Sequence, residues 1–193
     1  MLIQGSWGWM KLAVLTVMLP AAIDSLDLAV RNDLQRHHDS RLDPIMQVAT
    51  NLGRKDILFG LLLGVAILDP AAGPATARLA VTSLVGTNLV VEGLKWAVDR
   101  PRPHGVHQRS NASFPSGHAA SAFALAVVFA RRWKRAAVAF WLLASIVGFS
   151  RLYLDRHYLT DVAVAIAIGI SCASLLTRWR LATTWGLPQR KPT

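Results

Sequence analysis

Apolar residues occur in six separated runs along the chain, at residues 12–23, 57–68, 79–91, 119–130, 136–149 and 162–176. Several runs are shorter than the roughly 20 residues that a bilayer-spanning helix needs. Each run lengthens when moderately polar flanks are included, as in 7–28 or 159–176. Most interrupting charges stand at run ends, where long side chains can reach the membrane interface. The pattern predicts an all-α, polytopic membrane bundle of six transmembrane helices, with residues 1–193 as a single membrane-embedded domain.

The first run resembles a secretory signal peptide in part, because Lys11 precedes it and small residues follow near its end. Pro20, Asp24 and Asp27 interrupt the small-residue pattern that a cleavage site requires. We therefore expect a retained first helix.

The longest polar region, residues 24–56, predicts a surface helix and a lead-in to the second span. Asp43-Pro44 within it is typical of a helix start, with Asp43 as the cap and proline at the first helical position. His37-His38 could suggest a metal site, but no further ligand stands at suitable spacing. A solvated face is the better interpretation.

The composition and net charge do not alter the prediction of a membrane protein. The chain is 53% hydrophobic and 17% charged, against about 25% charged in ordinary soluble domains. Its net charge of +10 could suggest nucleic-acid binding. However, the positive residues stand at the ends of apolar runs, where they orient helices and meet anionic lipid. We expect the bilayer, and no nucleic acid, as partner. Cys172, the single cysteine, is interpreted as a packing residue.

The orientation rests on the segment RRWKR, residues 131–135, which puts four positive charges into a short connection. Short loops of this kind stay in the cytoplasm. Tryptophans typical of an interfacial belt fall near the same face, at Trp7, Trp9, Trp133, Trp179 and Trp185. This indicates a bacterial inner (cell) membrane protein whose opposite face meets the periplasm or the cell exterior.

Three polar segments share that opposite face if the helices alternate: KWAVDRPRP at 95–103, PSGH at 115–118 and SRLYLDRHYLTD at 150–161. Lys95, Arg102 and Arg151 supply fixed positive charge, and an arginine can bind two phosphate oxygens at once. Ser116 and Gly117 open a predicted helix, whose free N–H groups and dipole favour an anion. These residues predict a phosphate-binding site.

Two histidines accompany that site. His157 and Asp161 are four positions apart and would share a helix face. The carboxylate can then hold one imidazole nitrogen and leave the other free to attack. His118 is placed to donate a proton to a leaving group. Taken singly, each residue could be an interfacial anchor or a helix-end charge. Together they predict a nucleophile, its orienting partner and an acid.

The three segments resemble the three motifs of the type 2 phosphatidic acid phosphatase (PAP2) superfamily, K-x6-R-P, P-S-G-H and S-R-x5-H-x3-D. They match without a departure, and the six-run layout resembles the integral-membrane branch. The resemblance implies a metal-independent lipid phosphatase without cofactors. It implies His157 as the nucleophile that forms a phosphohistidine, Asp161 as its orienting partner and His118 as the acid. Phosphate binding falls to Lys95, Arg102, Ser116, Gly117 and Arg151.

Nearby polar residues leave alternatives open. Glu92 lies three positions before Lys95 and could pair with it. Arg100, His104, His107 and Arg109 share one outer loop, where they either contact a lipid headgroup or form an ordinary solvated loop.

The favoured substrate is an undecaprenyl-type diphosphate or phosphatidylglycerophosphate, on the weak ground that a minimal chain suggests a housekeeping enzyme. Phosphatidate and phosphorylated lipid A are alternatives. Soluble vanadate haloperoxidases share the anion cradle, but the hydropathy argues against that branch. A transporter should carry acids and bases at run centres, and a catalytically inactive lipid-binding relative should lack a histidine. The oligomeric state stays open.

Overall fold

The computed structural model describes residues 22–69, 73–105 and 111–178, and these ranges contain helices and no strand. Residues 22–36 form the first described helix, which we call the amino-terminal helix. The elements that follow it are η1 (Ser40–Leu42), α2 (Asp43–Asn51), α3 (Lys55–Leu68), α4 (Gly73–Val98), α5 (Gly117–Arg132), η3 (Lys134–Ala136), α6 (Ala137–Tyr153) and α7 (Leu159–Arg178). The all-helical fold predicted from the apolar runs is confirmed for this part of the chain.

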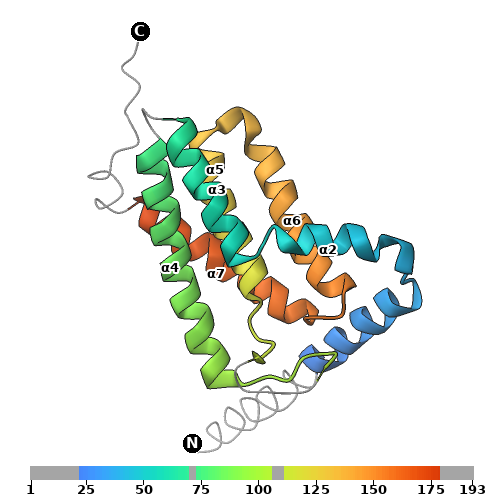
Figure 1. The fold of residues 1–193 in the computed structure, drawn as a ribbon. Helices are drawn as coiled ribbons and strands as arrows, with labels where there is room; N and C mark the ends of the chain where they lie inside the picture. The colour runs from blue at the N-terminus through green and yellow to red at the C-terminus, as the bar shows by residue number, and fades with distance from the viewer. Residues whose placement is uncertain (1–21, 70–72, 106–110, 179–193) are drawn as a thin grey trace, which may run out of the picture.

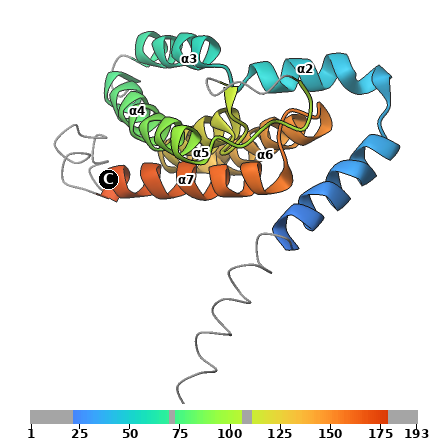
Figure 2. The ribbon, with the colours of Figure 1, turned by 90° about the horizontal axis from the view of Figure 1, so that it is seen from below.

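Helix α5 is the centre of the bundle (Figure 1) and packs against α4, α6 and α7. Viewed from below, α2 and α3 lie on one side of α5 and α7 lies on the other (Figure 2). Helix α3 packs against α4, and α2 against α6. This arrangement buries most of α5 and leaves the other helices with one outer face each.

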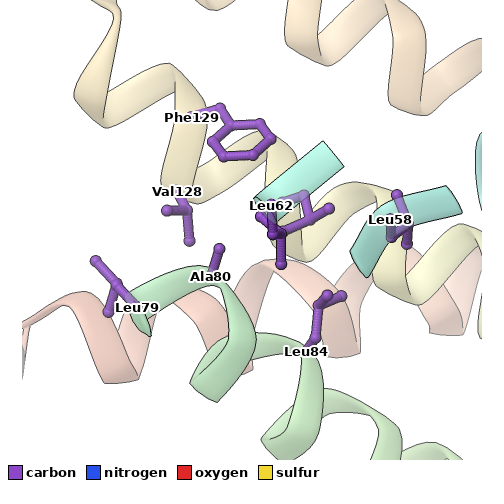
Figure 3. Close-up of a cluster of buried hydrophobic side chains, with 8 residues drawn as sticks. Leu58, Leu62, Leu79, Ala80, Leu84, Val128 and Phe129 are labelled. Carbon is purple, nitrogen blue, oxygen red and sulfur yellow. The ribbon is translucent and has the colours of Figure 1, made fainter. Parts of the chain in front are cut away.

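Apolar side chains, mostly leucines, fill the space between α3, α4 and α5 (Figure 3). Leu58 and Leu62 come from α3, Leu84 from α4, and Val128 and Phe129 from α5. Their apolar side chains recur three or four positions apart, which puts them on one face of each helix. The cluster holds the outer pair α3 and α4 on the central helix.

Helices α5 and α7 approach one another closely because small residues line their contact. Ala165, Gly169 and Ala173 follow one face of α7 at intervals of four, and both alanines are fully buried. A methyl group at Gly169 would lie 2.3 Å from the carbonyl oxygen of Ala120. Such small-residue contacts let membrane helices pack with their backbones nearly touching.

Two helical segments of the described chain are long and apolar enough to cross a membrane, Lys134–Tyr153 and Leu159–Arg178. The runs at 57–68, 79–91 and 119–130 do form helices, but α3 has 14 residues and α5 has 16. The prediction of six transmembrane helices is therefore confirmed only as a helical bundle. The first run lies outside the described residues except for its last two positions.

Large apolar side chains stand exposed on the outer faces. Leu68 is 86% exposed, and Leu89 and Val138 are each 70% exposed. Exposing so many apolar groups to water is unfavourable. Such a surface indicates contact with a membrane or a partner. A lipid-facing surface accounts for these residues.

A helix does begin at Asp43-Pro44, as predicted, but Asp43 is its first residue and Leu42 occupies the cap position. His37 is exposed beside Asp33. His38 lies 2.8 Å from Asp43 and its ring stacks on Tyr153. Among the described residues no group of three or more His, Cys, Asp or Glu side chains could hold a metal ion.

The close approach at Gly169 yields a test. Gly169→Ala should destabilise the bundle by about 1–3 kcal/mol, because the methyl group forces α5 and α7 apart. Thermal unfolding in detergent micelles measures the effect. Gly64→Ala is the matched control, since a methyl group there meets nothing within 4 Å and improves helix propensity by about 1 kcal/mol. Equal melting temperatures for the two variants would contradict the packing described here.

Candidate active site

Backbone hydrogen bonds bring the three polar segments together where α4 and α6 end and α5 and α7 begin (Figure 1). The N–H of Ser113 donates to the carbonyl of Arg100 at 2.7 Å, and the N–H of Ser116 donates to the carbonyl of Asp161 at 3.1 Å. Within the third segment, the N–H of His157 donates to the carbonyl of Arg151 at 3.2 Å. Each segment is thus fixed relative to the next by its main chain.

His157 is buried, and its protonation state follows from its partners. Its Nδ1 lies 2.8 Å from the carbonyl oxygen of Ser113. A carbonyl only accepts hydrogen bonds, so Nδ1 carries the proton and Nε2 keeps its lone pair. Nε2 faces a guanidinium nitrogen of Arg102 at 3.4 Å. The free nitrogen therefore points toward positive charge, where a phosphate group would sit.

Asp161 lies behind the imidazole. Its Oδ2 is 3.6 Å from His157 Nδ1, which is within ion-pair distance and beyond an ordinary hydrogen bond. The same oxygen accepts hydrogen bonds from Ser113 Oγ and from the N–H of Tyr158. The expected shared helix face is wrong, because His157 lies in the turn before α7. The turn still brings the carboxylate beside the ring.

Two predicted phosphate ligands carry buried polar atoms without a hydrogen-bond partner. Ser116 Oγ and Arg151 Nε are both of this kind, whereas the Nη1 of Arg151 donates to Thr50 Oγ1 at 2.6 Å. Buried donors normally find a partner. At Gly117 a methyl group would meet Val91 at 3.8 Å, an ordinary contact, so packing alone does not require glycine there. Both observations fit a site built for a ligand.

The remaining cations surround the same space. Arg102 donates from Nε to the carbonyl of Asn111 at 3.0 Å. Lys95 lies 3.6 Å from Glu92, which confirms the predicted pair. Arg151, Arg102 and Lys95 are all close enough for their charges to act on His118. The positive side chains thus converge on the two histidines from two of the three segments, 95–103 and 150–161.

His118 is the second residue of α5 and is half-buried. Gly53, between α2 and α3, makes room for it. A methyl group at Gly53 would lie 3.0 Å from His118 Cβ, 3.1 Å from its Cδ2 and 2.8 Å from Val147 Cγ1. The loop after α2 therefore packs directly on the second histidine.

A sequence model described as the PAP2 superfamily matches residues 76–185, which include all three segments. The chain belongs to the PAP2 superfamily.

Its relatives within the superfamily are phosphatases by name. The PAP2 chain is 34% identical over 105 residues to a lipid A 1-phosphatase of Porphyromonas gingivalis, covering 51% of this chain and 23% of that protein. It is 28% identical over 153 residues to the undecaprenyl-diphosphatase BcrC of Bacillus subtilis, covering 74% of this chain and 77% of that protein. The matched part thus spans about a quarter of the first relative and most of the second.

The fold also matches a solved PAP2 structure. The first transmembrane PAP2 type phosphatidylglycerolphosphate phosphatase from Bacillus subtilis superposes with a TM-score of 0.73. The match covers 90% of this chain and 96% of that one at 24% identity. This likeness supports a membrane PAP2 bundle as the architecture.

Sequence reasoning missed three residues around this PAP2 site and the partners of a fourth. Ser113, Thr50 and Gly53 carry no periodic or charge signal in the sequence. Arg100 was noticed as a loop cation, but its ion pairs with buried acids were not expected. It donates to Asp161 at 2.9 Å, and its guanidinium lies 4.2 Å from the centre of the Tyr158 ring. Of its loop neighbours, His104 is exposed, and His107 and Arg109 lie outside the described residues.

Burial and neighbouring charge control the titration of His157. Burial is the main cause that lowers its pKa to about 4; the charges of Arg151 and Arg102 act in the same direction, and Asp161 opposes them. Burial also lowers the pKa of Arg102, and the charge of Arg156 acts in the same direction. The imidazole is therefore neutral near neutral pH, with a lone pair on Nε2.

This titration is measurable. We expect His157 in the full-length protein to gain its proton only as the pH falls through about 4, below the ordinary value of 6.5. Because the unfolded chain binds that proton more readily, the fold should lose stability as the pH falls below 6.5. Imidazole-labelled NMR, assigned with His157→Gln, follows the ring directly. A midpoint near 6.5 would show an exposed ring and contradict the described burial.

Proposed function

We propose that this PAP2 protein is a lipid phosphatase that removes the terminal phosphate from a membrane lipid phosphate or diphosphate through a phosphohistidine on His157. The observation that carries the proposal is the geometry of that imidazole. Nδ1–H is held by the Ser113 carbonyl, and the free Nε2 faces Arg102. Buried, unpartnered donors of Ser116 and Arg151 belong to the set of predicted phosphate ligands.

In the first step, Nε2 of His157 attacks phosphorus and the bond from phosphorus to the leaving oxygen breaks. Burial and the surrounding cations lower the pKa of His118, so its acid form requires the bound phosphate, whose negative charge offsets theirs. His118 then gives its proton to the leaving oxygen, and the phosphoryl group stays on His157. In the second step, His118 accepts a proton from water, the water oxygen attacks phosphorus, and the N–P bond breaks to release phosphate. The positive charge that forms on the imidazole lies 3.6 Å from the Asp161 carboxylate, which stabilises it.

The groups that converge in front of His157 Nε2 would bind the phosphate. Lys95, Arg102 and Arg151 oppose the negative charge of the phosphate oxygens. The Ser116 hydroxyl and the first free N–H groups of α5, at Gly117, complete the cradle. These donors are fixed before the reaction, so they stabilise charge in the transition state without reorganisation.

A lipid substrate is supported by the surroundings of the site. A groove of about 1230 Å³ lies between α3, α5 and α6, with Leu58, Phe129 and Val147 among its lining residues. Val147 is also the residue that faces Gly53 beside His118. Val147 thus links the groove lining to the packing around His118, and a largely apolar groove suits the hydrocarbon chain of a lipid phosphate.

Among substrates we favour an undecaprenyl-type diphosphate or phosphatidylglycerophosphate. The undecaprenyl-diphosphatase relative aligns with 74% of this chain, the lipid A 1-phosphatase with 51%. Phosphatidate and phosphorylated lipid A are the alternatives within the family. A transporter is disfavoured, because the ionisable residues of the site lie near the ends of α4 and α6 and the starts of α5 and α7.

The two histidines should differ in what they contribute. A phosphatidate expels an alkoxide, which needs a proton, whereas a polyprenyl diphosphate expels a phosphate monoester that is already a stable anion. His118→Ala should therefore slow phosphatidate hydrolysis about 10²–10⁴-fold and diphosphate hydrolysis far less. His157→Ala should abolish both. Single-turnover dephosphorylation in EDTA measures the chemical step.

Wild-type protein that hydrolyses no lipid phosphate in that assay would contradict the proposed function. A requirement for an added divalent ion would contradict the metal-free mechanism. Equal losses for His118→Ala on both lipids would show that His118 positions the phosphate instead of protonating the leaving group.

We propose the bacterial inner membrane as the location, with the site facing the periplasm or the cell exterior. The support is the RRWKR segment at the opposite end of α5 from Gly117. In a Cys172→Ser background, His104→Cys should react with a membrane-impermeant thiol reagent in intact cells, and Lys134→Cys should not. Both positions are exposed, so burial does not bias the comparison. The reverse labelling would put the active site in the cytoplasm.

A further inference from the structure

Asp27 is a buried acid that is far from the three motifs in sequence. It lies on the amino-terminal helix and is 1% exposed. Its carboxylate accepts three hydrogen bonds: from the N–H of Thr160 at 2.9 Å, from Thr160 Oγ1 at 2.5 Å and from Arg100 Nη2 at 2.8 Å. Thr160 belongs to the first turn of α7. Asp27 therefore caps α7 from another helix, with its negative charge at the positive end of the helix dipole.

Arg100 connects this acid to the active site. Its Nη1 donates to Asp161 Oδ1 and to Thr160 Oγ1, both at 2.9 Å, while Nη2 binds Asp27. Burial acts to lower the pKa of Arg100, but its hydrogen bond with Asp27 and the charge of Asp161 outweigh that effect and raise it. The guanidinium thus stays charged between two buried carboxylates.

The amino-terminal helix also binds the start of the turn that carries His157, opposite the end where Asp27 binds Thr160. Arg31 donates to both carboxylate oxygens of Asp155, at 2.7 and 2.8 Å. Asp155 has a φ of 52°, a left-handed conformation that costs energy in a residue other than glycine. Arg31 at Asp155 and Asp27 at Thr160 therefore bracket the nucleophile between them.

We propose that Asp27 and Arg100 are positioning residues of the nucleophile, which fix the place of Asp161 and the net negative charge behind the His157 ring. This inference rests on the proposed function of His157. The three side chains Asp27, Arg100 and Asp161 together carry a net charge of about −1. That charge lies on the Nδ1 side of the ring, opposite Arg102, and favours the imidazolium that phosphoryl transfer creates.

Neutralising Asp27 makes the net charge behind the His157 ring less negative, and neutralising Arg100 makes it more negative. Asp27→Asn leaves about 0 behind the ring, whereas Arg100→Gln leaves about −2. The other ionisable groups that act on His157 or share its site are Arg102, Arg151, His118 and Lys95, and neither substitution touches them. A loss of fold or of packing would not move the His157 titration in opposite directions.

The experiment compares full-length variants in detergent. Asp27→Asn should lower the NMR titration midpoint of His157 relative to wild type, and Arg100→Gln should raise it. Both should reduce single-turnover phosphoryl transfer from farnesyl diphosphate by about 10-fold or more, since small misplacement of a reacting group is costly. KM should change little, because neither residue is a phosphate ligand.

Asp24→Asn is the matched control. Asp24 lies on the same helix, 3.3 Å from Arg100, but its side chain is 67% exposed. Solvent screens an exposed charge, so both the midpoint and the rate should stay near the wild-type values. Arg100→Lys keeps the charge and loses the two-sided hydrogen bonding. It should retain the wild-type midpoint while the rate falls.

Midpoints that move in the same direction for Asp27→Asn and Arg100→Gln, or that do not move, would overturn the inference. If Asp27→Asn does not fold, the pair Arg100→Gln and Arg100→Lys decides: equal midpoints for the two would equally overturn it. The NMR titration needs no turnover. Failure of the wild type to hydrolyse any lipid phosphate would therefore count against the proposed function and leave this charge relation separately testable.

Discussion

The hydrogen bond from the Ser116 N–H to the Asp161 carbonyl joins the amino ends of α5 and α7, and the active site depends on it. The bond forms only if the two helices nearly touch. Gly169 permits this, since any side chain there would collide with the Ala120 carbonyl. The main chain thus brings the P-S-G-H segment, with His118, against the segment that carries His157. The distance between the α5 and α7 backbones therefore determines how the side chains of the active site lie relative to one another.

A second consequence of this contact is the separation of charge across the His157 ring. Positive groups gather on the Nε2 side, where Arg102 approaches to 3.4 Å. Negative groups gather on the Nδ1 side, where Asp161 and, through Arg100, Asp27 are buried. Buried charges are costly unless they are paired and hydrogen-bonded. The acids meet this condition through Arg100, Ser113 and Thr160. The cation side keeps unpartnered donors, and a phosphate would satisfy them.

Most of the helical layout and the site composition could be predicted from sequence. Apolar periodicity marks helices reliably, and the three motifs name the residues that the fold brings together. The Glu92–Lys95 pair followed from local spacing. Helix boundaries were less accurate, and His157 turned out to lie in a turn, because spacing alone does not distinguish a helix from the turn before it.

The missing parts are contacts between distant segments. Ser113 binds Asp161 across 48 positions, and Asp27 binds Thr160 across 133. No periodicity or motif marks such partners, because they are set by how helices pack. Arg100 shows the difficulty best. In sequence Arg100 is one of several cations in a polar loop. In the fold it is the cation that forms ion pairs with two buried acids, Asp27 and Asp161.

The account is tested most directly by trapping the phosphorylated enzyme. Full-length protein would be mixed with radiolabelled diphosphate lipid, quenched at high pH to preserve a nitrogen–phosphorus bond, and mapped by mass spectrometry. We predict an acid-labile phosphoryl group on His157, absent from His157→Ala and retained in His118→Ala. A phosphoryl group on His118 or on any other residue, or rapid turnover with no trapped intermediate, would contradict it.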